Sequence, residues 1–565
     1  MAKRAPAVIV AMLATCCLLY AFHDRFWYPP DEGNYAHVAQ RLLQGETLNL
    51  QVQDVHPGYI SFVNAAALRV FGTDLVSLRY PLVLVGLVQA AVLFFLFPRE
   101  EPWRAAVASI ALTALSAIQF LNPTAHWYCL ALTVLLVAVL GSSRGAQQQS
   151  VRRLLAAGLL IGTIILFRQL TGFLAGVGAL AFLLWEAGER GAHGRAALLG
   201  RALAATMAVA LAVYLALATD ISGLVLFGVW PLALLWRLAS RPQASNREVT
   251  RIAGTVVAGM TLAALPLAAY HLWHGSVQAW ADDVGPAAVA LTRLDFFERS
   301  NFAALIYHAA RQMVTSPSVP AVLNGFYWVT LPLLAAVNGF LVLRRIGRAG
   351  STAALPVMPT LAVFYAVVSV HFQIPVYLYY SAGLSLASLL WLAPHVSPLA
   401  ARVSVTVTLV LAVTGVYFHA GQPASRGISG TLRGDRRPST WASTLPHNSL
   451  RIDPEEGRRY EALVKLIRRE VPADEAIFAV PSNAELYFMA ERPNPFRFYN
   501  TALGVRSDED LALVERTLRD DPPRLVTFNR DDKYNTPRSL RIMEMVRTRY
   551  ALIGGIDSFE VYVRR

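Results

Sequence analysis

The sequence has little cysteine, little lysine and few charged residues for its length. Only three cysteines, Cys16, Cys17 and Cys129, occur in 565 residues, and all lie in or beside apolar segments. They imply no disulfide framework. Charged residues make up 15% of the chain and hydrophobic residues 55%. This composition is too apolar for a soluble enzyme with an ordinary core, and it points to a membrane protein.

The net charge of +13 does not indicate a nucleic-acid-binding protein. Lys3, Lys465 and Lys533 are the only lysines, so nearly all of the basic residues are arginines. Much of this charge lies in short loops between apolar segments rather than on one soluble surface. A nucleic acid partner is therefore excluded.

Apolar runs recur through the first three quarters of the chain, each near the length that crosses a bilayer. They predict a polytopic α-helical membrane protein with about thirteen spans. The run after Lys3 and Arg4 lacks a small-residue cleavage site before "HDRFWY", so we expect an uncleaved first span. The predicted spans lie near 5–22, 77–97, 103–121, 127–141, 153–168, 171–187, 197–218, 221–238, 251–270, 321–343, 353–370, 376–393 and 401–419.

Arginines and acids alternate between successive loops. With the N-terminus inside, the inside loops carry most arginines, including Arg104, Arg153, Arg247 and Arg344, whereas the opposite loops carry most acids. The positive-inside rule then predicts a multi-pass protein of a bacterial inner membrane, with a cytoplasmic N-terminus and an outer C-terminus. The acids of the outer loops include Asp24, Asp31, Glu32, Asp54, Asp220, Asp282 and Asp283.

Two domains are predicted, a transmembrane catalytic domain over 1–419 and an outer α/β domain over 420–565. The second starts with the linker "GQPASRGISGTLRGDRRPST". A helical pattern at 455–470 follows, and then the strand-like runs "AIFAV", "RLVTF" and "FEVYV". Because this domain has no nucleophile or phosphate-loop signature, we expect it to pack or to dock an acceptor. Within the first domain, 271–320 is predicted to be a mobile outer loop.

The first outer loop, 23–76, contains "YPPDEGNYAHVAQRLLQGE" at 28–46. Asp31 follows two prolines and precedes a helical apolar stripe that begins at Tyr35, which predicts an amphipathic surface helix. "QDVHPGYISFVNAAALRVFG" at 53–72 predicts a second one. Asp31 admits two interpretations. It could cap the helix, with Glu32 favoured by the helix dipole, or it could be a catalytic carboxylate.

Arg168 stands in the apolar stretch "TIILFRQLTG". A charge in such a context is costly and is by default functional, with an anionic partner. The alternative is an arginine that extends to the outer surface beside Gln169. An outer cation near a loop carboxylate suggests a site that binds a lipid phosphate and performs acid–base chemistry beside it.

Four segments resemble the glycosyltransferase C (GT-C) superfamily, in particular its protein O-mannosyltransferase and aminoarabinose transferase branch. The resemblance covers essentially the whole chain. It rests on "PDEGNYAHVAQRLLQGE", on "SLRYPLVLVGLV", on "LFRQLTG" and on "VPADEAIFAVPSNAELYFMAERPNPFRFYN".

The resemblance implies inverting transfer of a sugar from a polyprenyl-phosphate donor to an acceptor on the outer side of the membrane. The acceptor would be an envelope glycan, a lipid or a protein. Asp31 would be the general base, with Glu32 raising the proton affinity of the pair or orienting the acceptor. Arg168 would bind the leaving phosphate, which needs no general acid. No cofactor is required, and a divalent metal is left open.

Three histidines depart from the family pattern. His56 forms a His-Pro corner where the aminoarabinose enzymes have Lys-Pro, and His126 lies in a loop where many relatives place an acid. His371 stands where many members carry arginine. Each one alone is an ordinary interfacial histidine. Together with Tyr35 and Asp54 they are predicted to line the substrate and phosphate site, and their spacing assigns no metal.

Two other functional classes fit parts of the sequence. A transporter or flippase of lipid-linked sugars would also have many spans and an intramembrane arginine, but such proteins usually show internal repeats, and none is evident. An envelope-polymer ligase more often carries its large outer loop late in the chain. The sugar, the acceptor and the carrier length stay open.

Overall fold

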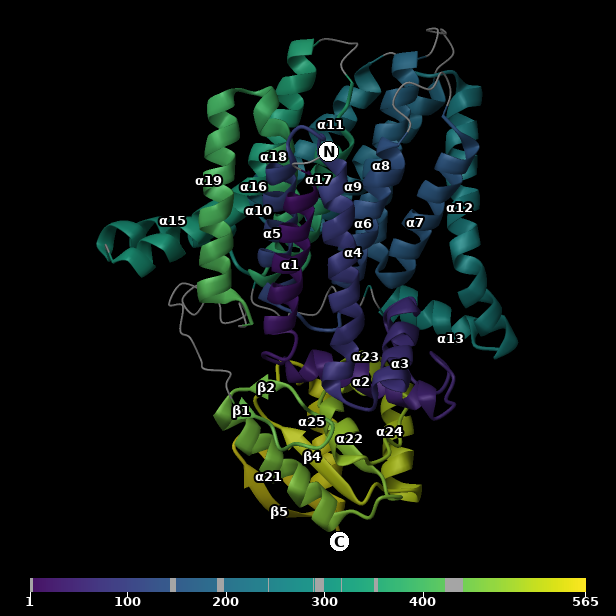
Figure 1. The fold of residues 1–565 in the computed structure, drawn as a ribbon. Helices are drawn as coiled ribbons and strands as arrows, with labels where there is room; N and C mark the ends of the chain where they lie inside the picture. The colour runs from purple at the N-terminus through teal and green to yellow at the C-terminus, as the bar shows by residue number, and fades with distance from the viewer. Residues whose placement is uncertain are drawn as a thin grey trace.

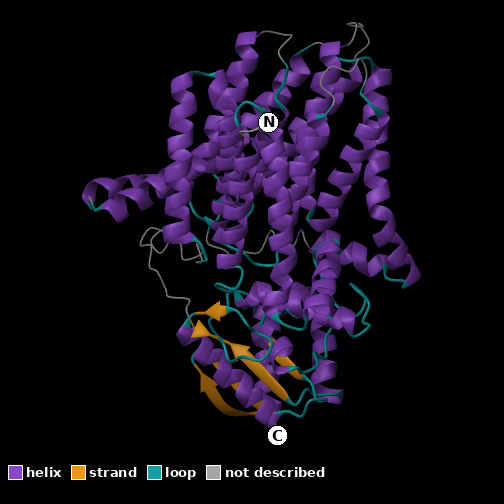
Figure 2. Ribbon diagram, viewed as in Figure 1, coloured by secondary structure: helices purple, strands orange, loops and turns teal. Residues whose placement is uncertain are grey.

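A long helical bundle and a smaller domain of helices and strands make up the computed structural model (Figures 1 and 2). The bundle ends against two short helices of the first outer loop, and the smaller domain lies beyond them. The structure describes residues 4–142, 149–190, 198–241, 243–287, 289, 299–316, 318–349, 354–421 and 441–565.

Each predicted span coincides with a helix of the bundle, because the apolar runs satisfy their backbone hydrogen bonds internally. Several helices continue from or into a short 3₁₀ or π segment. The bundle helices are α1 (Arg4–Phe22), α4 (Tyr80–Leu96), α5 (Pro102–Ala114), α6 (Ala125–Gly141), α7 (Val151–Phe167), α8 (Gln169–Arg190), α9 (Leu198–Ala218), α10 (Ile221–Gly223), α11 (Val229–Ser240), α12 (Asn246–Trp273), α16 (Val319–Ala349), α17 (Val357–Tyr365), α18 (Val376–Leu392) and α19 (Pro398–Thr414).

The polytopic helical architecture predicted from the sequence is confirmed. In the described residues, nine helices are long and apolar enough to cross a membrane. The segments Ala125–Gly141 and Val357–Val370 are apolar but shorter. The number of thirteen crossings therefore stays a prediction.

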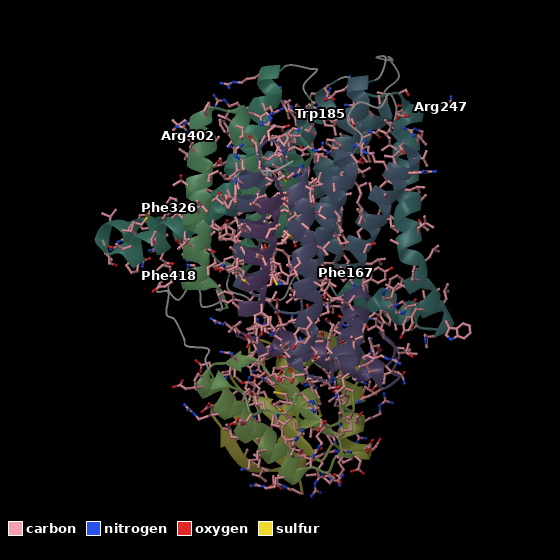
Figure 3. The ribbon with its side chains drawn as sticks, viewed as in Figure 1. Phe167, Trp185, Arg247, Phe326, Arg402 and Phe418 are labelled. Carbon is pink, nitrogen blue, oxygen red and sulfur yellow. The ribbon has the colours of Figure 1, made fainter. Side chains whose placement is uncertain are left out.

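Two arginines of the predicted inner loops lie at one end of the bundle. Figure 3 places Arg247 and Arg402 at the end opposite the C-terminal domain. The first outer loop lies at the other end, against that domain. These described segments are thus separated as the charge pattern predicts, while their assignment to the inner and outer sides of a membrane stays a prediction.

The helices α7 and α12 pack closely. A Cβ atom on Gly158 of α7 would lie 2.1 Å from the Val256 carbonyl oxygen of α12. Such small-residue contacts let two membrane helices approach each other. Further along the chain, α7 ends at Phe167 and α8 begins at Gln169, so Arg168 stands at the break between them.

Both amphipathic helices predicted for the first outer loop are present. They are α2 (Pro29–Leu43) and α3 (Tyr59–Phe71). Helix α2 does not lie on an open surface, because the C-terminal domain packs against it (Figure 1). A Cβ atom on Gly33 of α2 would lie 2.4 Å from the backbone nitrogen of Glu485 in α22 (Ala484–Ala490), so glycine permits this docking.

The segment 271–320 contains α13 (Val277–Asp282) and α15 (Phe302–Thr315), which projects sideways from the bundle in Figure 1. The mobility predicted for this segment falls partly on 288, 290–298 and 317, which lie outside the described residues. Asp283, directly after α13, is buried and pairs with Arg497 of the C-terminal domain at 2.5 Å.

The C-terminal domain is built on a four-stranded sheet of order β3-β4-β6-β5. The strands β3 and β4 are parallel, and the other two pairs are antiparallel. Helix 455–470 and the three predicted strands are confirmed, whereas β5 was not predicted. Linker residues 422–440 lie outside the described residues. The elements are α21 (Pro454–Glu470), β3 (Ile477–Val480), α22, α23 (Thr501–Gly504), α24 (Asp508–Asp520), β4 (Leu525–Asn529), α25 (Pro537–Arg549), β5 (Tyr550–Ile556) and β6 (Phe559–Arg564), with β1 (Trp441–Ala442) and β2 (Arg451–Ile452) in a separate pair.

Candidate active site

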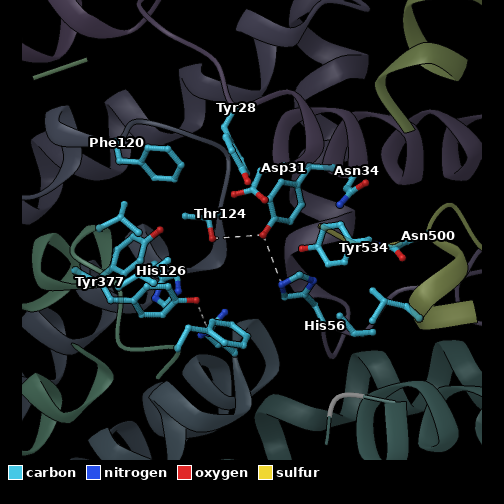
Figure 4. Close-up of a pocket in the computed structure, with 18 of the residues that line it drawn as sticks. Tyr28, Asp31, Asn34, His56, Phe120, Thr124, His126, Tyr377, Asn500 and Tyr534 are labelled. Carbon is cyan, nitrogen blue, oxygen red and sulfur yellow. Dashed lines mark hydrogen bonds between the residues drawn. The ribbon is translucent and has the colours of Figure 1, made fainter. Parts of the chain in front are cut away.

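A cavity of about 360 Å³ lies where the bundle, α2 and the C-terminal domain meet (Figure 4). It combines charged and hydroxyl-bearing side chains with apolar ones. Its lining residues come from segments that are far apart in the sequence. They include Tyr28, Asp31, Asn34, Tyr35, Asp54, His56, Phe120, Thr124, His126, Arg168, Phe372, Ile374, Val376, Tyr377, Tyr380, Tyr499, Asn500, Lys533 and Tyr534.

Asp31 faces this cavity and does not cap its helix. The N-cap residue of α2 is Tyr28, and Pro29 and Pro30 occupy the first two helical positions. Proline is well suited to that place because the first helical N–H groups have no intrahelical acceptor. Asp31 therefore stands within the first turn, and its Oδ2 accepts a hydrogen bond of 2.9 Å from Asn122 Nδ2. The capping interpretation of Asp31 is wrong.

The environment of Asp31 makes it a stronger base than an ordinary aspartate. Burial raises its pKa, while Lys533, His56 and the Asn122 hydrogen bond act in the opposite direction. A carboxylate with a raised pKa binds a proton more readily, and the nearby cations favour its charged form.

Glu32 does not line the cavity and is fully buried. Its Oε1 pairs with Arg79 at 2.5 Å, and its Oε2 accepts a hydrogen bond of 2.7 Å from the backbone nitrogen of Tyr28. Arg79 also donates to the carbonyl oxygens of His23, Arg25 and Phe26. These contacts fix the start of α2, so Glu32 holds Asp31 in place and is not positioned to touch a substrate.

Asp54, His56 and Tyr35 form a connected group on one wall. Asp54 accepts hydrogen bonds from His56 Nδ1 at 2.8 Å and from the Ser61 hydroxyl. Burial acts to raise the pKa of Asp54, but the interactions with His56 and Ser61 lower it overall. The Tyr35 hydroxyl lies 3.5 Å from His56 Nε2 and donates to Thr124 Oγ1 at 3.4 Å, as Figure 4 shows.

Arg168 reaches the cavity from the break between α7 and α8. Its Nη2 lies 3.5 Å from the hydroxyl of Tyr377, which is a neutral partner. Its Nε is buried and has no hydrogen-bond partner among the described residues. The side chain points into the cavity wall rather than out along the surface. A partly buried guanidinium with an unsatisfied donor is suited to bind an anion.

The two remaining predicted histidines lie at different depths. His126 lines the cavity, and its ring stacks on Tyr380 with 3.6 Å between the ring centroids. His371 lies behind the wall, 5.8 Å from the ring of Tyr377. His371 therefore supports a cavity residue and is not part of the lining.

The C-terminal domain contributes residues that the sequence did not predict. Lys533, Tyr534, Tyr499 and Asn500 all line the cavity. Lys533 Nζ donates a hydrogen bond of 3.0 Å to the Tyr28 hydroxyl. The available signal was the scarcity of lysine, because Lys533 is one of three in the chain. The sequence predicted only a packing or acceptor-docking role for this domain and assigned no role to Lys533.

A search for metal ligands was negative within the described ranges. There, no group of three or more histidine, cysteine, aspartate or glutamate side chains is arranged to hold a metal ion.

Residues 55–214 match the family model described as dolichyl-phosphate-mannose-protein mannosyltransferase. This range includes His56, His126 and Arg168 but begins after Asp31. The match confirms the resemblance to this branch of glycosyltransferases that was drawn from the sequence. No curated protein sequence matches the chain.

Three solved structures show a low overall similarity. ArnT from Cupriavidus metallidurans in the apo state is 13% identical, with a TM-score of 0.40 over 100% of this chain and 98% of that one. The same protein bound to undecaprenyl phosphate is 14% identical, with a TM-score of 0.41 over 99% and 96%. The apo oligosaccharyltransferase of Archaeoglobus fulgidus is 11% identical, with a TM-score of 0.40 over 93% and 69%.

The family match falls on the bundle helices that carry the histidine and arginine side chains of the cavity. The architecture is that of a polytopic membrane protein with a small C-terminal domain at one end. Over residues 55–214 the chain is therefore similar to membrane glycosyltransferases of the mannosyltransferase branch, and it carries this similarity on a polytopic helical architecture.

Proposed function

We propose that this protein transfers a sugar from a polyprenyl-phosphate carrier to an acceptor hydroxyl or phosphate, on the outer side of the membrane and with inversion. The observation that carries the proposal is the shared cavity of Asp31 and Arg168. Asp31 offers a carboxylate base whose pKa is raised. Arg168 offers a guanidinium whose buried Nε has no hydrogen-bond partner among the described residues. When an acceptor displaces a phosphate leaving group from a sugar, a base removes the acceptor proton and a cation stabilises the leaving phosphate.

Arg168 is assigned to the donor phosphate. A phosphodiester carries one negative charge, and it gains a second as the bond to the sugar breaks. A guanidinium held in a water-poor cavity stabilises this developing charge. The Tyr377 hydroxyl beside Arg168 Nη2 supplies a further hydrogen-bond donor. Phe372, Ile374 and Val376, on the same part of the wall, are suited to the first isoprene units of the carrier.

Asp31 is assigned to the acceptor. It removes the proton from the acceptor oxygen as that oxygen forms a bond to the anomeric carbon. At the same time the bond from this carbon to the phosphate oxygen breaks, and its electron pair stays on the phosphate. The single displacement inverts the anomeric centre. Because the leaving phosphate needs no proton, one carboxylate is sufficient, unlike in glycosidases.

The group formed by Asp54, His56 and Tyr35 is assigned to the sugar. Asp54 orients the His56 ring, and the Tyr35 hydroxyl lies between His56 and Thr124. Hydroxyl and imidazole groups at such a wall hydrogen-bond sugar hydroxyls. His126 and Tyr380 offer stacked rings close by, which suits the apolar face of a sugar ring.

A transferase and a flippase of lipid-linked sugars are separated by their products. The protein in liposomes, supplied with polyprenyl-phosphate sugars and extracts of envelope lipids and glycans, should release free polyprenyl phosphate and form a new glycoconjugate, both detected by mass spectrometry. A deletion strain should lack one sugar modification and accumulate one polyprenyl-phosphate sugar. Movement of intact donor across the bilayer without cleavage would contradict the proposal.

A further inference from the structure

The C-terminal domain places a lysine in the wall of the cavity, beside the helix that carries Asp31. Lys533 lies in the loop after β4, and Asp31 lies near the start of α2. Both line the same cavity. The domain has one other lysine, Lys465, which is exposed on α21. The position of Lys533 is therefore not a consequence of a generally lysine-rich surface.

Contacts with Tyr28 of the first outer loop and with its own neighbour Tyr534 hold the Lys533 side chain. Its Nζ donates a hydrogen bond of 3.0 Å to the hydroxyl of Tyr28. The ammonium lies 5.6 Å from the ring centre of Tyr28 and 5.1 Å from that of Tyr534, which is cation–π distance. Tyr28 is the N-cap residue of α2, three positions before Asp31. Lys533 thus links the outer domain to the start of the helix that carries the proposed base.

The neighbouring acid Asp532 also acts on the charge of Lys533. Its Oδ2 accepts a hydrogen bond of 2.8 Å from Ser482, and its Oδ1 accepts one of 2.9 Å from the backbone nitrogen of Tyr534. These contacts shape the loop from which Lys533 Nζ donates its hydrogen bond to Tyr28.

The cavity lining contains acids and cations close together. Asp54 is paired with His56 at 2.8 Å. Arg168 is assigned to the donor phosphate by the proposed function. Asp31 and Lys533 line the same cavity, and the charge of each acts on the other. A carboxylate enclosed by protein has lost much of its hydration, and a nearby cation favours its charged form.

We propose that Lys533 is a positioning residue that keeps Asp31 ionised. The C-terminal domain thereby supplies a residue on which the activity of the proposed base depends. This inference rests on the proposed role of Asp31 as the base. Among the influences that lower the pKa of Asp31, Lys533 is the strongest. Conversely, burial lowers the pKa of Lys533 to about 8, and Asp31 acts to raise it.

Other titratable groups also face Asp31. Some of them favour its charged form, and others disfavour it. His56 and Arg168 stabilise its charge as Lys533 does, whereas Glu32 on the same helix shares its sign. The tyrosines that interact with its charge are Tyr28 and Tyr35 on the first outer loop, Tyr377 and Tyr380 on α18, and Tyr499 and Tyr534 on the C-terminal domain.

The first test is the pH profile of kcat/KM for Lys533→Met, Lys533→Arg and the matched control Lys465→Met, all in the full-length protein. Activity requires ionised Asp31 and is lost as the pH falls through its pKa. Removal of the cation raises that pKa, so the acid limb of Lys533→Met should move to higher pH by about one unit or more. Lys533→Arg and Lys465→Met should keep the wild-type limb. An unshifted limb in Lys533→Met would overturn the proposal.

The second test does not require a known substrate. The thermal midpoints of wild type, Lys533→Met, Asp31→Asn and the double variant form a double-mutant cycle. Each single variant leaves one charge without its partner, so the double variant should recover part of the summed loss. Additive shifts would refute the Asp31–Lys533 interaction even if the protein proves to be no transferase. If Lys533→Met does not fold, Lys533→Gln takes its place in both tests with the same expectations.

Discussion

Asn122 Nδ2 donates a hydrogen bond of 2.9 Å to Asp31 Oδ2, and it joins a loop of the helical bundle to the first turn of α2. The bond occupies one carboxylate oxygen of Asp31, and the residue lines the cavity. A side chain held in this way is oriented before an acceptor arrives, which is what a general base requires.

Glu32→Gln should lower stability and leave the chemistry largely intact. Glu32 and Arg79 form a fully buried ion pair, and removal of one charge leaves the other without its partner. The expected loss is about 3–5 kcal/mol of unfolding free energy. Thermal unfolding in detergent, followed by activity measured per folded molecule, checks this. A stable but inactive Glu32→Gln would place Glu32 in the catalytic machinery after all.

Gly33→Ala should disturb the contact between α2 and the C-terminal domain. The new Cβ would meet the backbone of Glu485 at 2.4 Å, which the two helices can relieve only by moving apart. We expect a lower thermal midpoint and lower activity. Gly254→Ala is the matched control, because Gly254 is also helical and has nothing within 4 Å of its Cβ position. Equal effects of the two substitutions would show that helix propensity, not docking, decides the outcome.

Arg168→Ala should weaken donor use more than Arg168→Lys. Lysine keeps the positive charge but lacks the planar fork that binds two phosphate oxygens at once. The KM for the donor and the competition by free polyprenyl phosphate measure this effect. Unchanged donor affinity in Arg168→Ala would remove Arg168 from the phosphate site.

Reporter fusions should place the two ends of the bundle on opposite sides of the membrane. Fusions at Ser143 and at Gln422, which precedes the C-terminal domain in the sequence, should give opposite signals. The positive-inside rule assigns Ser143 to the cytoplasm. Equal signals from both fusions would contradict an odd number of crossings and the outer location of the cavity.

Local patterns were sufficient to predict most of the fold. Apolar runs located the bundle helices, and the apolar stripe of 28–46 located α2. The strand β5 was missed because most of its residues are not buried and it contains Gly554 and Gly555, so it lacks the buried apolar pattern of β3. Antiparallel pairing with β6, not a local sequence pattern, makes it a strand.

The candidate site was only partly predictable, because its residues are brought together by tertiary packing. Asp31 and Arg168 stood out as charges in unusual local contexts. The choice between cap and catalyst for Asp31 depended on where α2 begins, and this is set by Pro29 as its first residue. Lys533 lies about 500 residues from Tyr28 in the sequence, and no local pattern indicates that they are in contact.

The turnover of Asp31→Asn tests the central claim most directly. Asparagine is nearly isosteric, and its side-chain oxygen can still accept the hydrogen bond from Asn122, but it cannot take up the acceptor proton. We expect the single-turnover rate of sugar transfer to fall by roughly a hundredfold or more. Protein abundance and donor affinity should stay near those of the wild type, since neither depends on proton transfer. A folded Asp31→Asn protein with wild-type turnover would contradict the account.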